Sequence, residues 1–221
     1  MNSNSGIQHK IRPCPGRPKD VQKRRGIVAA ARNLFLQQGY ELTSMEAVAK
    51  LADVSKLTIY RHFDNKADLF REVIREGCER QVAADNFSNY AGQPPEQALL
   101  QLGVSLVKLI FNPESLRLLR IIQAEALHHP QIVQVFYQAG PQRVKSAFAE
   151  LLQVWVAQGR LAVADIPRAC EQFFSLLKGE AHLKALLHQD AGLNDAEMAE
   201  HVRACVRLFL AGYGLNPTEA G

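Results

Sequence analysis

Apolar residues recur every three or four positions along most of this chain, which is the period of helices that bury one face. The sharpest local signals lie between residues 43 and 66. Thr43 and Ser44 are helix-capping types that precede one apolar-periodic run, and Ser55 is placed to cap a second. Asp53 falls where the chain must turn between them, and aspartate tolerates a left-handed backbone. This pattern predicts a helix, a tight turn and a second short helix.

The second of these helices is expected to bury Val54, Ile59 and Phe63 and to present a polar and aromatic face outward. An ordinary pair of capped helices with a solvated face would produce much of the same pattern. A cation, hydroxyls and an aromatic ring together on one exposed face favour a helix-turn-helix that reads the DNA major groove. The outward residues are Lys56, Leu57, Thr58, Tyr60, Arg61 and His62.

The helical period stops between Asp85 and Pro95, where Asn, Ser, Gly, Gln and Pro accumulate, and then resumes. The rest of the chain shows neither the alternation typical of strands nor an internal repeat. An all-α protein is therefore predicted. Its expected parts are a disordered basic arm over residues 1–19, a three-helix DNA-binding domain over residues 20–84, and a larger helical domain over residues 95–215.

Residues 43–66 read Thr-Ser-x-x-x-Val-Ala-x-x-Ala-x-Val-Ser-Lys-x-Thr-Ile-Tyr-Arg-His-Phe-x-Asn-Lys, which resembles the N-terminal domain of the TetR family of bacterial transcriptional regulators. The likeness covers roughly residues 23–80. It implies that Lys56, Leu57 and Thr58 face base edges, and that Tyr60, His62, Lys66 and the Thr43–Ser44 pair contact phosphates. The expected DNA-binding set is Arg17, Thr43, Ser44, Ser55, Lys56, Leu57, Thr58, Tyr60, Arg61, His62 and Lys66.

Three residues depart from that family pattern. Asp53 stands where glycine is usual, so the turn is expected to be slightly strained. Glu46 replaces a basic or amide residue that many members place near the bases, which argues against direct readout by the first of the two helices. Leu57 replaces a commonly small residue, and its side chain could contact a thymine methyl group.

Positive charge is concentrated near the N-terminus, although the net charge of the chain is only +4. Up to residue 32, eight Lys or Arg residues face one acid, Asp20. Such an arm suits attraction to DNA phosphates and a salt-dependent affinity. Within it, Gly16-Arg17-Pro18 resembles the core of hooks that enter a narrow minor groove. Non-specific phosphate contact by the arm is the alternative.

Residues 115–180 resemble the C-terminal domain of an AefR-like branch of the same family, through Leu119–Ala126, Pro130, Gly140-Pro141 and Gly159–Leu161. The resemblance implies a dimerising helical domain that often holds a small apolar or amphipathic effector. Plain core packing is the alternative for the same side chains. Gln123 and Glu125 are the expected polar anchors. The expected lining is Leu102, Leu106, Phe111, Leu119, Ile122, Gln123, Glu125, Phe136, Tyr137, Phe148, Trp155 and Phe174.

Dimerisation is expected on physical grounds as well, because helix-turn-helix proteins usually read paired half-sites. Two helices near the C-terminus, from each of two subunits, could form a four-helix bundle. Burial of the same faces inside one subunit is the alternative. The expected interface residues are Phe173, Leu177, Ala181, Val202, Cys205 and Phe209.

Several functional classes find no support in the sequence. No run approaches the ~20 apolar residues of a membrane span, and the N-terminus lacks the apolar core of a secretory signal. The four scattered cysteines indicate free thiols in a reducing compartment, with a redox-sensing pair as the alternative. Neither catalytic sets nor metal-ligand spacing nor a phosphate loop is present, so neither an enzyme nor a cofactor or metal site is expected.

A cytoplasmic, nucleoid-associated regulator is therefore the predicted function, most simply a homodimeric repressor that responds to a ligand. Its expected partners are a near-palindromic double-stranded DNA operator, a second copy of the chain and a small effector. The competing hypothesis is an architectural DNA-binding protein without an effector, held on DNA by the basic arm.

Overall fold

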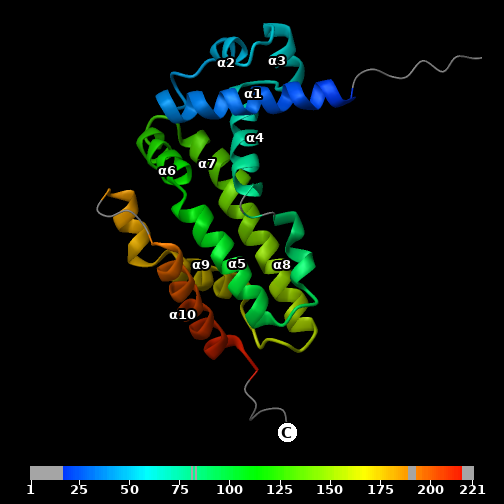
Figure 1. The fold of residues 1–221 in the computed structure, drawn as a ribbon, viewed down its shortest axis with the longest axis vertical. Helices are drawn as coiled ribbons and strands as arrows, with labels where there is room; N and C mark the ends of the chain where they lie inside the picture. Colours follow the sequence, from blue (N-terminus) through cyan, green and yellow to red (C-terminus); the bar gives the residue numbers. More distant parts are fainter. Residues whose placement is uncertain (1–16, 81, 83, 189–192, 216–221) are drawn as a thin grey trace, which may run out of the picture.

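The computed structural model describes residues 17–80, 82, 84–188 and 193–215, and helices make up nearly all of this part (Figure 1). The helices follow one another as α1 (Arg17–Gln38), α2 (Met45–Leu51), α3 (Lys56–His62), α4 (Lys66–Glu79), a 3-10 helix η1 (Ala84–Tyr90), α5 (Pro95–Phe111), α6 (Pro113–Glu125), α7 (Pro130–Tyr137), a π-helical turn η2 (Gln138–Gln142), α8 (Arg143–Ala157), α9 (Ile166–Leu186) and α10 (Asp195–Tyr213). The all-α fold is thus confirmed.

The predicted helix-turn-helix forms as α2 and α3. Ser44 Oγ accepts a hydrogen bond from the Ala47 amide, and Ser55 Oγ accepts one from the Thr58 amide, so each serine caps its helix. Asp53 between them has a φ of 51°, the left-handed conformation expected there. The pair sits across α1 at one end of the molecule (Figure 1). Helix α1 begins at Arg17, so residues 17–19 of the expected arm are helical.

One hydrophobic core lies under the helix-turn-helix and is built around Phe35, Tyr40 and Phe70, whose rings are 5.1 to 5.7 Å apart. It does not end at the expected domain boundary. Ile122 of α6 and Ile132 of α7 are buried in the same core. Helices α6 and α7 therefore continue the packing of the DNA-binding domain rather than that of the C-terminal bundle.

The second core fills the other end of the molecule, among η1, α5, α8, α9 and α10. Its centre is aromatic: the rings of Phe148 and Phe173 stack at 4.9 Å, and Phe209 lies 5.1 Å from Phe173. Trp155 is fully buried beside them. Within the described residues, no helix is long and apolar enough to cross a membrane.

Two irregularities shape the helices between these cores. Pro141 lies inside the π-helical turn that joins α7 to α8, where a proline, lacking an N–H, cannot support regular helical bonding. Gly140 of this turn packs so closely on α4 that an added Cβ would meet Ile74 and Cys78 side-chain atoms at 3.1 and 3.2 Å. Gly179 interrupts α9 with a φ of 52° and kinks it.

Candidate nucleic-acid interface and interhelical cavity

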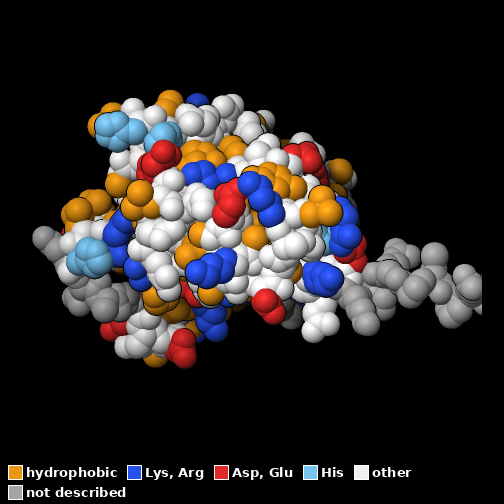
Figure 2. Space-filling model, turned by 90° about the horizontal axis from the view of Figure 1, so that it is seen from above, with side chains coloured by type: hydrophobic (Ala, Val, Ile, Leu, Met, Phe, Trp, Pro, Cys, Tyr) orange, Lys and Arg blue, Asp and Glu red, His pale blue; other side chains and the backbone are white. Residues whose placement is uncertain are grey.

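The outward face of α3 carries most of the predicted base-reading positions. Leu57 is 81% exposed and Tyr60 is 40% exposed, while Ile59 on the opposite side is fully buried. Lys56 is exposed as well, and its amine lies 5.9 Å from the centre of the Tyr60 ring. Figure 2 views this end of the molecule and shows cationic and apolar side chains next to each other. Such a surface suits a major groove, which offers both acceptors and thymine methyl groups.

Lys56 does not stand alone on this face. Its Nζ lies 2.6 Å from Glu46 Oε1, so the carboxylate that departs from the family pattern pairs with the expected base-reading cation. The hydrogen bond from Lys56 lowers the pKa of Glu46, and the same hydrogen bond raises the pKa of Lys56. Both groups are therefore charged near neutral pH, and Glu46 offsets the positive charge that Lys56 would offer to DNA.

The hydroxyl groups differ in their availability. Ser44 and Ser55 are exposed at the starts of α2 and α3, where helix N-termini favour an anion such as phosphate. Ser55 Oγ and Thr58 Oγ1 are 2.9 Å apart and share a hydrogen bond. Thr43 is different, because it is 1% exposed and its hydroxyl donates to the Gly39 carbonyl at 2.7 Å. The expectation that the Thr43 side chain contacts phosphate is wrong.

His62 and Lys66 also play other roles than expected. The His62 side chain is 8% exposed and points at Asp20 of α1, with 3.2 Å between Nε2 and Oδ1. Lys66 Nζ donates to the Tyr40 and Glu41 carbonyls at 2.9 and 3.0 Å and lies over the Tyr40 ring. The structure therefore turns both side chains inward, where they brace α3 and α4. Neither sequence spacing nor family position indicated these partners.

The two remaining predicted contacts are Arg61 of α3 and Arg17 at the start of α1. Arg61 is exposed but shares Asp20 with His62, with 3.0 Å between its Nη2 and the carboxylate. Arg17 is the first residue of α1, and its side chain, like Gly16, lies outside the described part of the structure. The predicted minor-groove hook therefore stays a prediction.

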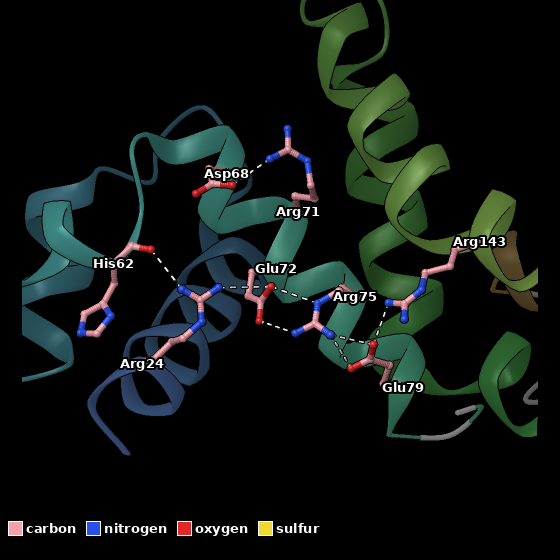
Figure 3. A network of polar contacts seen from close by, with 8 residues as sticks. All are labelled: Arg24, His62, Asp68, Arg71, Glu72, Arg75, Glu79 and Arg143. Atoms are coloured by element: carbon pink, nitrogen blue, oxygen red, sulfur yellow. Dashed lines mark hydrogen bonds and ion pairs between the residues drawn. The ribbon is translucent and has the colours of Figure 1, made fainter. Parts of the chain in front are cut away.

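A chain of ion pairs runs from α1 through α4 to α8 (Figure 3). Arg24 lies 3.4 Å from Glu72, whose other oxygen is 2.6 Å from Arg75. Glu79 then joins Arg75 and Arg143, at 2.7 Å from each. The hydrogen bond from Arg75 is the main reason that the pKa of Glu72 is lowered. These contacts connect the DNA-binding helices to the first residue of α8.

A cavity of about 590 Å³ lies where the two hydrophobic cores meet. That volume is within the range of roughly 300–1,000 Å³ usual for small-molecule sites. Its walls come from both ends of the chain: Phe35 of α1 and Ile74 of α4 face it from one side, and Leu106 of α5 and Phe174 of α9 from the other. A ligand in this position would touch α1 and α4 directly.

The structure selects only part of the predicted pocket. Leu106, Leu119, Phe136, Tyr137 and Phe174 line the cavity as expected. The others do not, because helix packing points them elsewhere. Leu102, Phe148 and Trp155 are buried in the C-terminal core, Ile122 is buried in the N-terminal core, Phe111 packs on the C-terminal core and on His182, and Gln123 is exposed.

Glu125 is not a polar anchor of this cavity either. Its Oε1 accepts a hydrogen bond from the Glu41 amide at 3.4 Å, and its Oε2 lies 3.8 Å from His129. It thus attaches the end of α6 to the loop between α1 and α2. The polar residues that do line the cavity were missed from the sequence. Their signal was weak, because each is an isolated polar residue in or next to a helix, with no partner at helical spacing that marks it as a site. They include Arg32, Arg80, Glu114, Lys145, Lys178 and His182.

The residues predicted for the dimer interface belong instead to the interior of one protomer. Phe173, Leu177 and Val202 are fully buried, and Cys205 and Phe209 are nearly so. Ala181 is partly buried. These residues therefore do not present an interface, and the alternative of burial within one subunit is correct for all except Ala181. The apolar side chains that α9 and α10 do expose are Leu183, Leu187 and Leu208.

The cysteines of the described residues are free thiols. Burial raises the pKa of Cys78, which lines the cavity, to about 11, and that of Cys170 to about 11. Both are therefore protonated near neutral pH and weakly reactive. No cluster of His, Cys, Asp or Glu within the described part could hold a metal ion.

Comparisons with known proteins place both halves of the chain in one family. Residues 27–73 match the model for bacterial regulatory proteins of the tetR family, and residues 97–215 match that for the C-terminal domain of AefR-like transcriptional repressors. A TetR-family transcriptional regulator from Mesorhizobium loti is 30% identical, with a TM-score of 0.74, over 90% of this chain and all of that chain.

Two further proteins are similar over most of their length. The flavonoid-responsive regulator FrrA is 30% identical, with a TM-score of 0.70, over 88% of this chain and 98% of its own. An HTH-type transcriptional regulator of Mycobacterium bovis is 24% identical over 175 residues, which are 79% of this chain and 80% of that protein. These relatives are transcriptional regulators and not enzymes.

Proposed function

We propose, from the premise that this chain belongs to the TetR family of DNA-binding transcriptional regulators, that it is a homodimeric repressor released from its operator by a small molecule. The observation that carries the proposal is the cavity between the two cores, because its wall includes α1 and α4 of the DNA-binding domain. A ligand there is in contact with the helices that hold α3.

The exposed face of α3 supports sequence-specific reading of DNA. Lys56, Leu57 and Thr58 would face base edges, with Lys56 freed from Glu46 to bind a guanine. Tyr60 and the exposed hydroxyls of Ser44 and Ser55 would contact phosphates and set the register. Arg61 would contribute to the same backbone contacts once it exchanges Asp20 for a phosphate.

A dimer follows from the geometry of operators. Two recognition helices must enter successive major grooves, which are ~34–36 Å apart. Helices α9 and α10 pack against each other and expose Leu183, Leu187 and Leu208, and two such pairs would make a four-helix bundle. The dimer surface is thus assigned to these leucines rather than to the buried residues first predicted.

The switch is a shift of α4. An effector in the cavity would contact Ile74 and Gly77 of α4 and displace the helix relative to α8, to which Glu79 binds through Arg143. The separation of the two recognition helices would then no longer match the operator. By linkage, the operator weakens effector binding by the same factor as the effector weakens operator binding. A flavonoid-responsive relative supports a small-molecule signal of this kind.

Selection of bound sequences from a random duplex pool tests the DNA-reading part of the proposal. An inverted repeat is expected, and it would supply the operator for effector screening. A·T-rich sequences without symmetry would contradict the proposal and favour architectural binding by the basic arm. Lys56→Ala should change the preferred base by ~1–3 kcal/mol, whereas Tyr60→Phe should weaken all sequences equally.

A second experiment tests the switch itself. Operator affinity is measured by fluorescence anisotropy with and without saturating amounts of each compound that binds the protein. The proposal expects at least one such compound to lower the affinity. It is contradicted if every compound that saturates the cavity leaves operator binding unchanged.

A further inference from the structure

The cavity between the cores carries an excess of positive charge on otherwise apolar walls. Four cationic side chains line it, Arg32, Arg80, Lys145 and Lys178, against two carboxylates, Glu114 and Glu171. Aromatic and aliphatic residues form most of the remaining surface. Charges that border a low-dielectric space act more strongly on a ligand than the same charges in water. The cavity is therefore matched to a molecule with an apolar body and a negative group.

We propose that the effector is an amphipathic organic anion, whose acidic group binds between Arg32 and Arg80. The inference rests on the proposed function in that it names the ligand class of the same cavity. It adds a location for the negative group and two residues that select for it.

The two arginines at this end of the cavity are loosely paired. Arg32 lies 4.0 Å and Arg80 lies 3.7 Å from the same oxygen of Glu114, and Arg80 lies 3.8 Å from Glu76. None of these separations is a hydrogen bond. Arg32 Nε is moreover buried and has no hydrogen-bond partner among the described residues. Two guanidinium groups thus retain donors that a carboxylate or phenolate of a ligand could accept.

Several other ion pairs of the protein are shorter than the contacts that Arg32 and Arg80 make with Glu114. Arg75 on the same helix as the cavity lining donates to Glu72 at 2.6 Å and to Glu79 at 2.7 Å. Across the cavity, Lys145 donates to Glu171 at 3.2 Å. These pairs leave little for a ligand to gain, since it would have to displace a bound carboxylate. Lys178, the fourth cation of the lining, is exposed on α9, where water screens its charge. The Arg32–Arg80 end is therefore favoured for the negative group.

The part of the lining around His182 on α9 suits an uncharged polar group better. Burial, together with the charge of Lys178, lowers the pKa of His182, so that its ring is neutral near pH 7. A neutral imidazole both donates and accepts hydrogen bonds, as Ser175 nearby in the cavity lining also does. A hydroxyl or carbonyl on the apolar body would find partners there.

The location of the two arginines ties this ligand class to the DNA-binding domain. Arg32 belongs to α1, and Arg80 is the C-cap of α4, whereas Glu114 lies in the first turn of α6. An anion that replaces Glu114 as their partner would remove the polar contact of Arg32 and Arg80 with the start of α6, while the shared hydrophobic core stays in place. The negative group would thereby change the contact between the DNA-binding helices and α6, beyond simply filling space.

The test uses two dyes that differ by one anionic sulfonate group and does not involve DNA. 8-Anilino-1-naphthalenesulfonate carries a sulfonate, and N-phenyl-1-naphthylamine is its uncharged counterpart; both fluoresce when they enter an apolar site. The full chain is titrated with each dye. The anion should bind at least about tenfold more tightly, at one dye per protomer, because one charge-assisted contact is typically worth that much.

Variants then locate the selectivity. The double variant Arg32→Gln, Arg80→Gln should reduce the affinity for the sulfonate about tenfold and leave the affinity for the neutral dye unchanged. Arg117→Gln makes the same chemical change on α6 outside this cavity and should alter neither affinity. Unchanged binding of the neutral dye also shows that the double variant retains the cavity.

Three results would overturn the inference. Equal binding of the two dyes by the natural chain would remove the charge selectivity, without requiring any variant to fold. Selectivity that survives in the double variant would place the negative group elsewhere, and failure of both dyes to bind would show that the cavity does not accept such molecules. Because DNA is absent, none of these outcomes depends on whether an operator is found.

Discussion

The two hydrophobic cores differ in what they hold together. The core around Phe148 and Phe173 joins helices of the C-terminal half alone, whereas the core around Phe35 and Phe70 joins the DNA-binding helices to α6 and α7. The cavity lies at the boundary between them. The boundary between the two cores therefore does not lie at the linker near residues 85–95, where composition changes. It lies between α6–α7 and the bundle of α5, α8, α9 and α10.

This difference is the physical basis for the proposal that a small ligand acts on DNA binding. A cavity inside either core would be fixed by dense packing on all sides, and filling it would change little else. At the boundary, the contacts between the two bodies include the apolar walls of the cavity, the pair of Glu79 and Arg143, and the hydrogen bond from Arg120 Nε to the Leu186 carbonyl. A ligand there changes the contact between two units that are each rigid.

The largest effect is expected from truncating the C-terminal core. Phe173→Ala should lower the free energy of unfolding by about 3–5 kcal/mol, since it removes a fully buried ring stacked on Phe148. Urea denaturation followed by circular dichroism measures this. Leu208→Ala is the matched control, because that side chain is 63% exposed on α10. It should weaken self-association in sedimentation while the protomer keeps its secondary structure.

If Phe173→Ala dissociated the dimer but left the protomer as stable as before, Phe173 would be an interface residue after all. The comparison between the two cores would then fail, because the C-terminal one would continue into a second subunit. Urea denaturation and sedimentation, measured over the same series of protein concentrations, distinguish a loss of protomer stability from a loss of self-association.

The sequence predicted a region correctly where the residues that determine its structure lie close together in the chain. The helix-turn-helix was predicted correctly because capping serines, a turn aspartate and an apolar period all act within a few residues of one another. The errors within it concern distant partners. His62 faces inward because Asp20, some forty residues earlier, lies opposite it on α1, and no local pattern indicates such a contact.

The C-terminal half was predicted as helices but not as an arrangement of helices. An apolar period identifies a buried face without saying what covers it. Phe174 lines the cavity and its neighbour Phe173 fills the core, and only the packing angle of α9 distinguishes them. The cationic lining escaped notice for a related reason, since Arg32 and Arg80 are far apart in the chain and meet only through Glu114.

A pair of glycine substitutions tests the packing contrast between core and boundary. An added Cβ at Gly103 of α5 would lie 2.6 Å from Val202 Cγ1, whereas at Gly77 of α4 it meets only the flexible end of Arg80 at 3.9 Å. Both variants gain up to ~1 kcal/mol of helix propensity. Gly103→Ala should nevertheless be less stable than Gly77→Ala by about 1–3 kcal/mol, because overpacking opposes the gain.

Thermal denaturation of the two alanine variants measures this difference directly. Gly77→Ala should equal or exceed the natural chain in midpoint temperature. An equal loss of stability in both variants would mean that the wall of the cavity is as densely packed as the core, which contradicts the proposed contrast.

A smaller effect is expected from the ion pairs that run along the DNA-binding core. Glu72→Gln should destabilise the protein by about 1 kcal/mol or less, because Arg75 is partly exposed and water screens the pair. The sign of its pH dependence is fixed. The folded pKa of Glu72 lies below the ordinary 4.5, so its carboxylate stabilises the fold above that value, and this contribution is lost as the pH falls through the folded pKa.

Urea denaturation at several values between pH 6 and pH 3 measures this contribution. The natural chain should lose more stability than Glu72→Gln over that interval. A constant difference between the two proteins at every pH would show that the pair contributes through packing and not through charge.

The smallest effect concerns the surface of α2 and α3, where neither core is touched. Glu46→Gln should leave unfolding unchanged and raise DNA affinity roughly two- to fivefold at low salt, because it releases the Lys56 amine that lies 2.6 Å from the carboxylate. The plot of log affinity against log salt should steepen by up to about 0.9, because the positive charge of Lys56, no longer offset by Glu46, then acts on the DNA phosphates as well as on the base that it binds. Glu150→Gln removes the same charge from the exposed surface of α8 and should not change the slope.

If both variants steepened the salt dependence equally, the gain in DNA affinity would come from net charge alone. If Glu46→Gln instead changed the preferred bases at constant slope, the unusual glutamate would act in specificity, by setting which base Lys56 binds, and not through the charge of the surface. Either result would show what Glu46 does on this surface, because Glu150→Gln controls for the change in net charge.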